Sequence, residues 1–446
     1  MFENRCQFQH FQHYLTGLIV LDNKSLANIT RCVLESADKT NLSRFFSEAP
    51  WFQEQGNDRR LTYLLPQTKA IRGPKADPIL MLDDTLCEPV GSLFDSVDRH
   101  DTHGDDTYPL AHHPVTSPYV SGPVRFPVDL RLYRRYAELT RWAEFVHKHC
   151  PDRSIPTQKK ARARLHKTVD PVLLEAPAFQ KLQQPFRTKI DLGIALLEAA
   201  IQHKVPFHVL LFDRWYLAAE LVSMARYRKK DWIILRKKNR NLETNSFVLK
   251  EAAGTPIRLE GAPLAVADLV ALLPPTAYHP VTVGDTTYWT FTLAVRLAGL
   301  GKVRLVVSFK SAELTGTYAV LVTNRVDWGA QRIITLYLQR WPIETFYQDG
   351  KTPLGLDEYR MRNAEAIGKH WCLVFVAYAL LHLDGLPPSP TKGSLPVKTM
   401  GEAWRQQAQA RMQALSLYAH ERLQLGQKAE DIFAYVFAKQ QTAVAR

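Results

Sequence analysis

The stretch between Thr188 and Arg240 constrains the fold most strongly, because it alternates helix and strand patterns. TKIDLGIALLEAAIQHK has the periodicity of an amphipathic helix, and VPFHVLLFD is a short apolar run typical of a buried strand. YLAAELVSMARYRKK predicts a second helix, and WIILRKKNR predicts a second strand. Alternation of this kind builds parallel sheets, so we expect an α/β protein with a parallel core.

Acidic side chains follow two of the predicted strands. The run from Pro78 to Leu82 ends in Asp83 and Asp84, and the strand VPFHVLLFD ends in Asp213. In sheets of this class, functional groups gather at the carboxyl ends of the strands. We therefore expect these carboxylates to lie close together at one edge of the sheet.

The remaining patterns divide the chain into five predicted parts. Residues 1–75 show helical periodicity, with Ser25 and Asn41 as expected N-caps, and predict a helical DNA-binding or assembly domain. The alternating run VRFPVDLRLY predicts a half-buried strand. The predicted boundaries are the first part of the core at 76–240, a β-rich insertion at 241–330, the last part of the core at 331–384, and a linker with a helical tail at 385–446.

The charge balance points to a polyanionic partner. The chain has 57 Lys and Arg against 44 Asp and Glu, which gives a net charge of +13 and a pI near 9.4. Nucleic acid is the most common partner of such proteins, although a basic membrane-surface protein would have a similar balance.

Cysteine usage and hydropathy indicate a cytoplasmic protein. The five cysteines lie far apart and form no C-x-x-C pair, which argues against a disulfide framework or a zinc ribbon. The first residues lack the pattern of a signal peptide. The longest apolar run, Trp371 to Leu381, spans eleven residues. A membrane-spanning helix needs about 20, so we expect a buried core helix and no membrane association.

RWPIETFYQDGK, at residues 340–351, raises a more specific question. On one helix, Tyr337, Arg340, Glu344 and Lys351 would share a face. Pro342 conflicts with this prediction, because an interior proline removes a backbone hydrogen bond. Taken alone, Arg340 and Glu344 predict a surface ion pair of about 0.3–0.5 kcal/mol.

Together with the strand-end aspartates, Glu344 predicts a different chemistry. Two aspartates at adjacent strand ends and a glutamate on a following helix can bind two Mg²⁺ ions about 3.5–4 Å apart. Such a pair activates a water or a 3′-hydroxyl and stabilises the leaving oxygen in phosphoryl transfer. Flanking cations would then hold the phosphates of the substrate.

The spacing Y-x2-R-x3-E-x6-K resembles the signature of bacterial insertion-sequence DDE transposases of the insertion-sequence-4-like superfamily. ILMLDDT resembles the first acidic motif of that family, LLFDRWY the second, and YAVLVTNR the strand before its glutamate helix. The resemblance covers about residues 76–375, and NLSRFFSEAPW resembles the entry domain of the 701-type branch.

The resemblance implies a ribonuclease-H-like core with a β-rich insertion, in which Asp84, Asp213 and Glu344 bind two Mg²⁺ or Mn²⁺ ions. Asp83 is expected either to face away from the site or to accept a hydrogen bond behind the metal ligands. The implied activity is DNA transposition, by strand cleavage at terminal inverted repeats and strand transfer into target DNA. A homodimer is the implied active complex, in the bacterial cytoplasm and associated with the nucleoid. The implied DNA contacts are Tyr337, Arg340 and Lys351, with Tyr318 as a stacking candidate beside Ala319.

Two basic runs are further candidates for DNA contact. RYRKKDWIILRKKNR, at 226–240, has eight Lys and Arg and follows Asp213 along the chain. Its predicted DNA-binding residues are Arg236, Lys237, Lys238 and Arg240. PTQKKARARLHKT, at 156–168, predicts a basic linker that either tracks DNA or is merely flexible.

Other motifs receive simpler interpretations. The second DDT, at 105–107, follows no apolar strand and predicts a loop. His100, His103, His112 and His113 lack the spacing of a zinc site, so we expect them in a solvated loop. GLGK, at 299–302, does not fit a phosphate-binding loop, and without a G-x-G-x-x-G motif we expect no nucleotide cofactor.

Two alternative functions remain open. A domesticated DNA-binding protein could keep this fold without the chemistry, although the three acidic residues argue against that loss. A glycosidase would use paired carboxylates, but it would leave the +13 charge unexplained.

Overall fold

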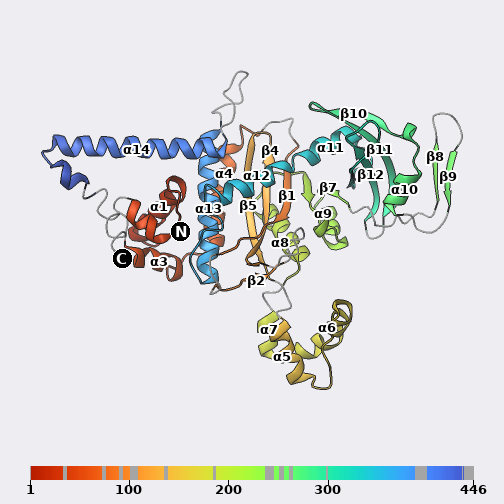
Figure 1. Cartoon of the computed structure of the whole chain (residues 1–446), viewed down its shortest axis with the longest axis horizontal. Helices are drawn as coiled ribbons and strands as arrows, with labels where there is room; N and C mark the ends of the chain where they lie inside the picture. Colours follow the sequence, from red (N-terminus) through yellow and green to blue (C-terminus); the bar gives the residue numbers. More distant parts are fainter. Residues whose placement is uncertain are drawn as a thin grey trace.

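The computed structural model describes most of the chain and is shown in Figure 1. The described residues are 2–33, 38–72, 77–89, 94–100, 109–134, 139–183, 187–236, 246–250, 256–260, 265–297, 300–386, 399–433 and 435.

A nine-stranded mixed sheet forms the centre of the molecule, in the order β10-β11-β12-β13-β7-β6-β1-β4-β5. Strands β1, β6 and β7 are parallel, and the other neighbouring pairs are antiparallel. The bounds are β1 Ile79–Asp84, β4 His113–Ser121, β5 Val124–Tyr133, β6 Val209–Phe212, β7 Asp231–Leu235, β10 His279–Val283, β11 Thr286–Leu297, β12 Gly301–Phe309 and β13 Tyr318–Thr323. The predicted mixture of strands and helices is confirmed as an α/β fold.

Helices cover both faces of the central strands (Figure 1). Even-numbered residues of β1, such as Leu80 and Leu82, pack in the same core as α8 (Lys189–Gln202) and α9 (Ala219–Tyr227). Odd-numbered residues, such as Ile79 and Met81, pack with α11 (Ala330–Leu338) and the start of α12 (Trp341–Lys351). Successive strand residues point to opposite faces, so double coverage explains why these runs are apolar throughout.

The N-terminal helices share a core with the end of the chain. Helices α1 (Arg5–Val20), α2 (Leu26–Cys32) and α3 (Lys39–Ser47) pack with α13 (Ala364–Gly385) in one hydrophobic cluster. Helix α4 (Gln53–Thr68) packs against α13, and α14 (Met400–Gln424) contacts α1 and α13. Ser25 caps α2 as predicted, but the expected cap at Asn41 is wrong, because Asp38 caps α3.

Helix α13 is the one helix in the described part of the chain with the length and apolarity to cross a membrane. Within its apolar window, 83% of the residues are buried inside the protein. Such burial is the property of a core helix, in agreement with the prediction for Trp371 to Leu381.

Three helices form a separate unit between β5 and α8, which we call the helical arm. The arm consists of α5 (Leu139–His149), α6 (Lys159–Leu173) and α7 (Pro177–Gln183), and it lies apart from the sheet in Figure 1. It has its own small core, centred on Trp142, Leu173 and Phe179. The prediction of a linker at 156–168 is therefore wrong, because most of that run is helix α6.

The segment after β7 extends the sheet. Strands β10 to β13 continue it outward from β7, and β13 returns to pair with β7. A separate hairpin is formed by β8 (Ser246–Lys250) and β9 (Pro256–Glu260), followed by α10 (Val266–Leu272) and the short helix η2 (Pro275–Ala277). A second two-stranded ribbon is formed by β2 (Asp98–Arg99) and β3 (Leu110–Ala111).

Two buried histidines on α13 predict acid sensitivity. Burial lowers the pKa of His370 to about 4 and that of His382 to about 3. His370 bonds to the Tyr14 hydroxyl and the Gly355 carbonyl, and His382 accepts from the Arg125 amide. The unfolded chain binds these protons near pH 6.5 and the folded chain does not. The stability is therefore present above pH 6.5 and is lost as the pH falls.

We expect His382→Gln to reduce this loss, because glutamine keeps an acceptor but cannot titrate. Between pH 6.5 and 4.5 the variant should lose about 2 kcal/mol less unfolding free energy than the wild type. Urea denaturation at several pH values measures the difference. His279→Gln, at an exposed position, is the control, and its unfolding free energy should fall with pH as steeply as that of the wild type. The same dependence of unfolding free energy on pH in all three proteins would contradict the prediction.

Candidate active site

The parallel pairing of β1 and β6 brings the strand-end aspartates to one edge of the sheet. Leu82 pairs with Phe212 in this register. The next residues along the two strands are Asp83 and Asp213, which therefore lie side by side at the carboxyl edge. Asp213 begins the short helix η1 (Arg214–Tyr216), which turns the chain away from the strand.

Asp83 and Asp84 point to opposite faces of the sheet. Asp83 pairs with Thr116 of β4, and the Thr116 hydroxyl bonds to the Tyr347 hydroxyl of α12 at 2.6 Å. Asp84 pairs with Val115, which belongs to the core on the α8 side. The expected orientation is thus reversed. Asp83 shares the α12 face with Asp213, and Asp84 faces away because strand residues alternate.

Asp84 is surrounded by three donors on the α8 side. Its Oδ2 accepts from Lys189 Nζ at 2.7 Å and contacts His113 Nε2, and its Oδ1 accepts from the Tyr216 hydroxyl at 2.7 Å. Burial opposes ionisation of this carboxyl, but the His113 hydrogen bond and the Lys189 charge outweigh it. They hold the pKa of Asp84 well below its usual range.

Sequence reasoning missed the three donors around Asp84. Two of them lie next to sequence features that could have identified them. Lys189 directly follows the helix-capping residue Thr188, and Tyr216 is part of the motif LLFDRWY. His113 had no such signal, because its contact with Asp84 depends on the antiparallel pairing of β1 and β4.

Asp83 has a different environment. Its Oδ1 accepts from the Asp84 amide at 2.9 Å, and its Oδ2 lies 3.6 Å from Arg340 Nη1. Burial and the neighbouring Asp84 charge raise the pKa of Asp83 to about 7, and Asp213 adds a smaller effect in the same direction. Of the two aspartates that end β1, Asp83 is therefore the one whose ionised form an added positive charge would stabilise more.

Glu344 approaches the edge from α12 and is paired with Arg340. Arg340 Nη2 donates to Glu344 Oε1 at 2.6 Å, while Nη1 faces Asp83. In this structure Arg340 therefore pairs with the glutamate, and its predicted contact with DNA stays a prediction. The guanidinium lies between two of the site's carboxylates and partly neutralises both.

Pro342 marks a break between two helices. Helix α11 ends at Leu338, and Pro342 lies in the first turn of α12. A proline there removes no helical hydrogen bond, because the first backbone N–H groups of a helix have no partner within it. The single continuous helix that we predicted is wrong, and the break sets the direction in which Arg340 and Glu344 leave the backbone.

The other predicted DNA contacts have varied positions. Lys351 donates to the Leu86 carbonyl at 2.7 Å, and Tyr337 is half-buried at the end of α11. Tyr318 packs on Phe309, with ring centroids 5.0 Å apart. The Arg236 side chain is buried, and Lys237, Lys238 and Arg240 lie outside the described residues.

Four of the eight basic residues in the run 226–240 lie at the sheet edge opposite the one predicted. Arg226 lies in the last turn of α9, and residues 228–230 join that helix to the start of β7, at the sheet edge opposite Asp213. Arg228 lies 3.6 Å from Glu198, and Lys230 donates to the Phe207 carbonyl at 2.7 Å. The proximity of these residues in the sequence to Asp213 was therefore misleading.

The expected solvated histidine loop is also wrong. His100, His112 and His113 are buried, and His103 lies outside the described residues. His112 bonds to the Tyr359 hydroxyl at 2.5 Å and to the Asp95 carbonyl at 2.8 Å. His113 contacts His100 and Asp84, so these histidines help to position the end of β1.

The oxygen donors at this edge suit a hard divalent cation. Asp83 and Asp213 offer carboxylates on one face, and Glu344 lies on the helix that covers that face. Mg²⁺ prefers such ligands and needs few from the protein. Within the described ranges, the structure gathers no group of three His, Cys, Asp or Glu side chains close enough to hold a metal. To join Asp83 and Asp213 as a third ligand, Glu344 would have to release Arg340 and bind the ion instead.

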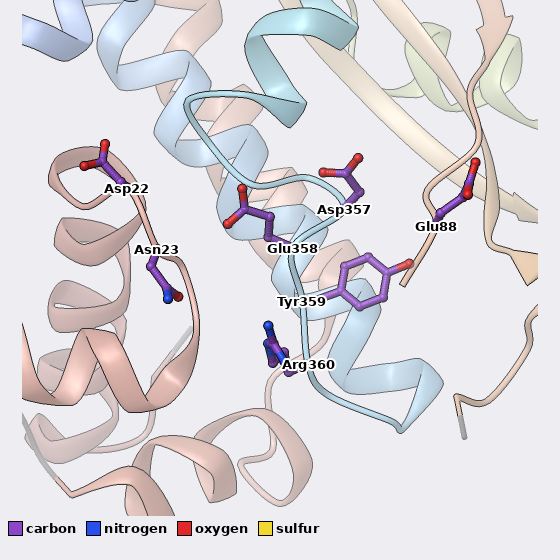
Figure 2. Close-up of a pocket in the computed structure, with 7 residues that line it drawn as sticks. All are labelled: Asp22, Asn23, Glu88, Asp357, Glu358, Tyr359 and Arg360. Atoms are coloured by element: carbon purple, nitrogen blue, oxygen red, sulfur yellow. The ribbon is translucent and has the colours of Figure 1, made fainter. Parts of the chain in front are cut away.

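A cavity of about 490 Å³ lies elsewhere on the molecule (Figure 2). It opens between the turn after α1, the extended segment at 357–360, and Glu88. Its lining residues are Asp22, Asn23, Glu88, Asp357, Glu358, Tyr359 and Arg360. Four of the seven are acids, so this cavity repels phosphate groups and is a poor candidate for binding DNA.

Comparison with protein families gives two matches. A family model described as "DDE superfamily endonuclease" matches residues 1–263, which is more than half of the chain. A second, described as "Transposase DDE domain", matches residues 181–380 and so includes Asp213 and Glu344. A search of curated proteins found no match.

The donors around Asp84 predict a stability effect. Lys189→Met leaves a carboxylate that is only 15% exposed without its cation, so we expect a loss of about 3 kcal/mol in unfolding free energy. Tyr216→Phe removes one hydrogen bond to the same carboxylate and should cost about 1.5 kcal/mol. Chemical denaturation measures both. The exposed variant Lys302→Met is the control, and a Lys189→Met protein as stable as this control would contradict the prediction.

Proposed function

The chain belongs to the DDE superfamily endonucleases, and from this premise we propose that it is a transposase that cuts and joins DNA at the ends of a mobile element. One observation carries the proposal. Asp83 and Asp213 are neighbours at the carboxyl edge of two parallel strands, and the helix with Glu344 covers the same face.

The strand order supports a ribonuclease-H-like core. Strands β5, β4 and β1 form an antiparallel unit, and β6 and β7 continue it in parallel with β1. We propose that residues 76–240 and 331–384 form this core and that 241–330 is an insertion. The helical segment 1–75 would serve DNA binding or assembly, as in the 701-type branch of the insertion-sequence-4-like superfamily, and 385–446 would be a linker with a helical tail.

We propose that the acidic residues at this edge bind two Mg²⁺ or Mn²⁺ ions. The set consists of Asp213, Glu344 and one aspartate of the Asp83–Asp84 pair. Bound divalent ions lower the pKa of a water and stabilise the leaving oxygen in phosphoryl transfer. The protein's part would be to hold the carboxylates in place.

The reaction would proceed in two displacements at phosphorus. Water attacks the phosphodiester at the element end, the bond to the 3′-oxygen breaks, and a free 3′-hydroxyl remains. That hydroxyl then attacks a target phosphodiester, and the target strand's own 3′-oxygen leaves. No covalent bond to the protein is needed.

Cationic side chains at the edge would hold the DNA. Arg340 is the leading candidate, because a guanidinium that leaves Glu344 can bind phosphate with the same fork of donors. Tyr337 lies beside it, and Lys351 and Tyr318 retain their predicted contacts as proposals. The partners would be terminal inverted repeats and target DNA, bound by a homodimer associated with the bacterial nucleoid.

The proposal predicts metal-dependent cutting that requires Glu344. A supercoiled plasmid that carries the DNA flanking this gene on both sides should be cut in Mg²⁺ and not in EDTA. We expect Glu344→Gln and Asp213→Asn each to slow cutting at least 100-fold, because each removes a charged ligand. Gel electrophoresis of the plasmid measures the rate.

The matched control is Glu421→Gln, an exposed glutamate on α14, which should cut like the wild type. Wild-type protein that binds the plasmid but never cuts it would favour the alternative, a domesticated DNA-binding protein of the same fold. Normal cutting by Glu344→Gln would contradict the role of that glutamate.

A further inference from the structure

Two neighbouring aspartates end β1, and the family resemblance selects Asp84 as the metal ligand. We propose instead that Asp83 binds the divalent cation and that Asp84 is a structural anchor for the strand end. This inference rests on the proposed function and names one residue of that site.

Asp83 and Asp84 differ first in the face of the sheet to which they point. The register pairs Leu82 with Phe212, so Asp83 and Asp213 are adjacent and point to the same face. That face is covered by α11 and α12, as the packing of Met81 with Ile333 and Ile343 shows. Asp84 points to the other face, across the thickness of the sheet from Glu344.

The carboxylate oxygens of Asp83 and Asp84 differ in how many hydrogen-bond donors they already contact. Both oxygens of Asp84 already accept from side chains, one from Tyr216 and the other from Lys189, with His113 in contact. To bind a cation, Asp84 would have to release these buried donors, and a buried donor without a partner is costly. Among the residues that the structure describes, Asp83 has only the Asp84 amide at Oδ1 and the Arg340 guanidinium, 3.6 Å away, near Oδ2.

Arg340 also distinguishes the two aspartates. The guanidinium reaches Asp83 with Nη1 and Glu344 with Nη2. It therefore occupies the position between two carboxylates where a cation is needed, and both carboxylates belong to the α12 face. Asp84 does not take part in this arrangement.

The paired variants Asp83→Asn and Asp84→Asn test the assignment. Asparagine keeps an Oδ1 acceptor in each case, but it removes the charge and replaces the Oδ2 acceptor with an amide donor. We expect Asp83→Asn to melt within a few degrees of the wild type and to bind Mn²⁺ at least tenfold more weakly in isothermal titration calorimetry. It should also cut the plasmid described above at least 100-fold more slowly.

Asp84→Asn should show the opposite pattern, with a lower melting temperature and near-normal Mn²⁺ binding in the folded protein. Wild-type Mn²⁺ affinity in Asp83→Asn would overturn the inference, whether or not Asp84→Asn folds. If Glu344→Gln and Asp213→Asn abolish cutting while Asp83→Asn cuts normally, only this inference fails. If none of the three affects cutting, the proposed function fails as well.

A second inference concerns the helical arm and comes from different observations. We infer that the arm binds duplex DNA beside the acidic edge. Residues 139–183 carry nine Lys and Arg against four Asp and Glu. Arg164 and Lys167, three residues apart on α6, are both exposed, and neither is needed for the arm's own core.

The position of the arm supports the same partner. The chain enters the arm after Tyr133, the last residue of β5, which pairs with His113. It leaves the arm at α8, whose first residue, Lys189, bonds to Asp84. Both connections therefore lie at the carboxyl edge of the sheet, so a duplex held by the arm would pass close to Asp83 and Asp213.

The salt dependence of DNA binding tests this second inference. In the full chain, Arg164→Gln/Lys167→Gln should reduce the slope of log Kd against log salt by about 2, because each phosphate contact contributes about 0.9. The probe is a duplex of the flanking DNA, followed by fluorescence anisotropy, with a random-sequence duplex in parallel. Arg405→Gln/Lys428→Gln, which removes the same charge from α14 and the segment after it, should leave the slope unchanged. Equal slopes for the two double variants would overturn the inference.

Discussion

The parallel pairing of β1 with β6 is the interaction on which the rest of the site depends. Its register places Leu82 opposite Phe212, and the next residue on each strand is an aspartate. A shift of one residue would send one of the two carboxylates to the other face. Apolar packing on both faces fixes this register, since Leu80 and Leu82 fill one core and Ile79 and Met81 fill another. The position of the carboxylates is thus a consequence of the hydrophobic core.

The two faces of the sheet at the end of β1 differ in how their carboxylates are neutralised. On the α8 side, Lys189 and the donors His113 and Tyr216 stabilise the Asp84 carboxylate, so that charge is satisfied within the protein. On the α12 side, Asp83 and Glu344 share the Arg340 guanidinium, and the pKa of the partly buried Asp83 is raised to about 7. The negative charge left on this side attracts cations, whereas the Asp84 side needs none.

Local patterns were sufficient to predict several of the strands and helices and the edge at which the acids meet. Periodicity identified β1, β6 and α8, and the core character of α13 followed from its length and composition. The choice between Asp83 and Asp84 could not be predicted, because it depends on pairing with β4 and β6, which are distant in sequence. For the same reason the buried histidines were mistaken for a loop. Pro342 was misinterpreted because one continuous helix was assumed where two meet.

The central claim is that the α12 face at the end of β1 holds the divalent cation. The most direct test is a crystal of the full chain soaked in Mn²⁺ and measured for anomalous scattering. We expect a peak bounded by Asp83, Asp213 and Glu344, with Arg340 displaced from the glutamate. A peak on the α8 side, coordinated by Asp84 with Lys189 and Tyr216 moved away, would contradict it.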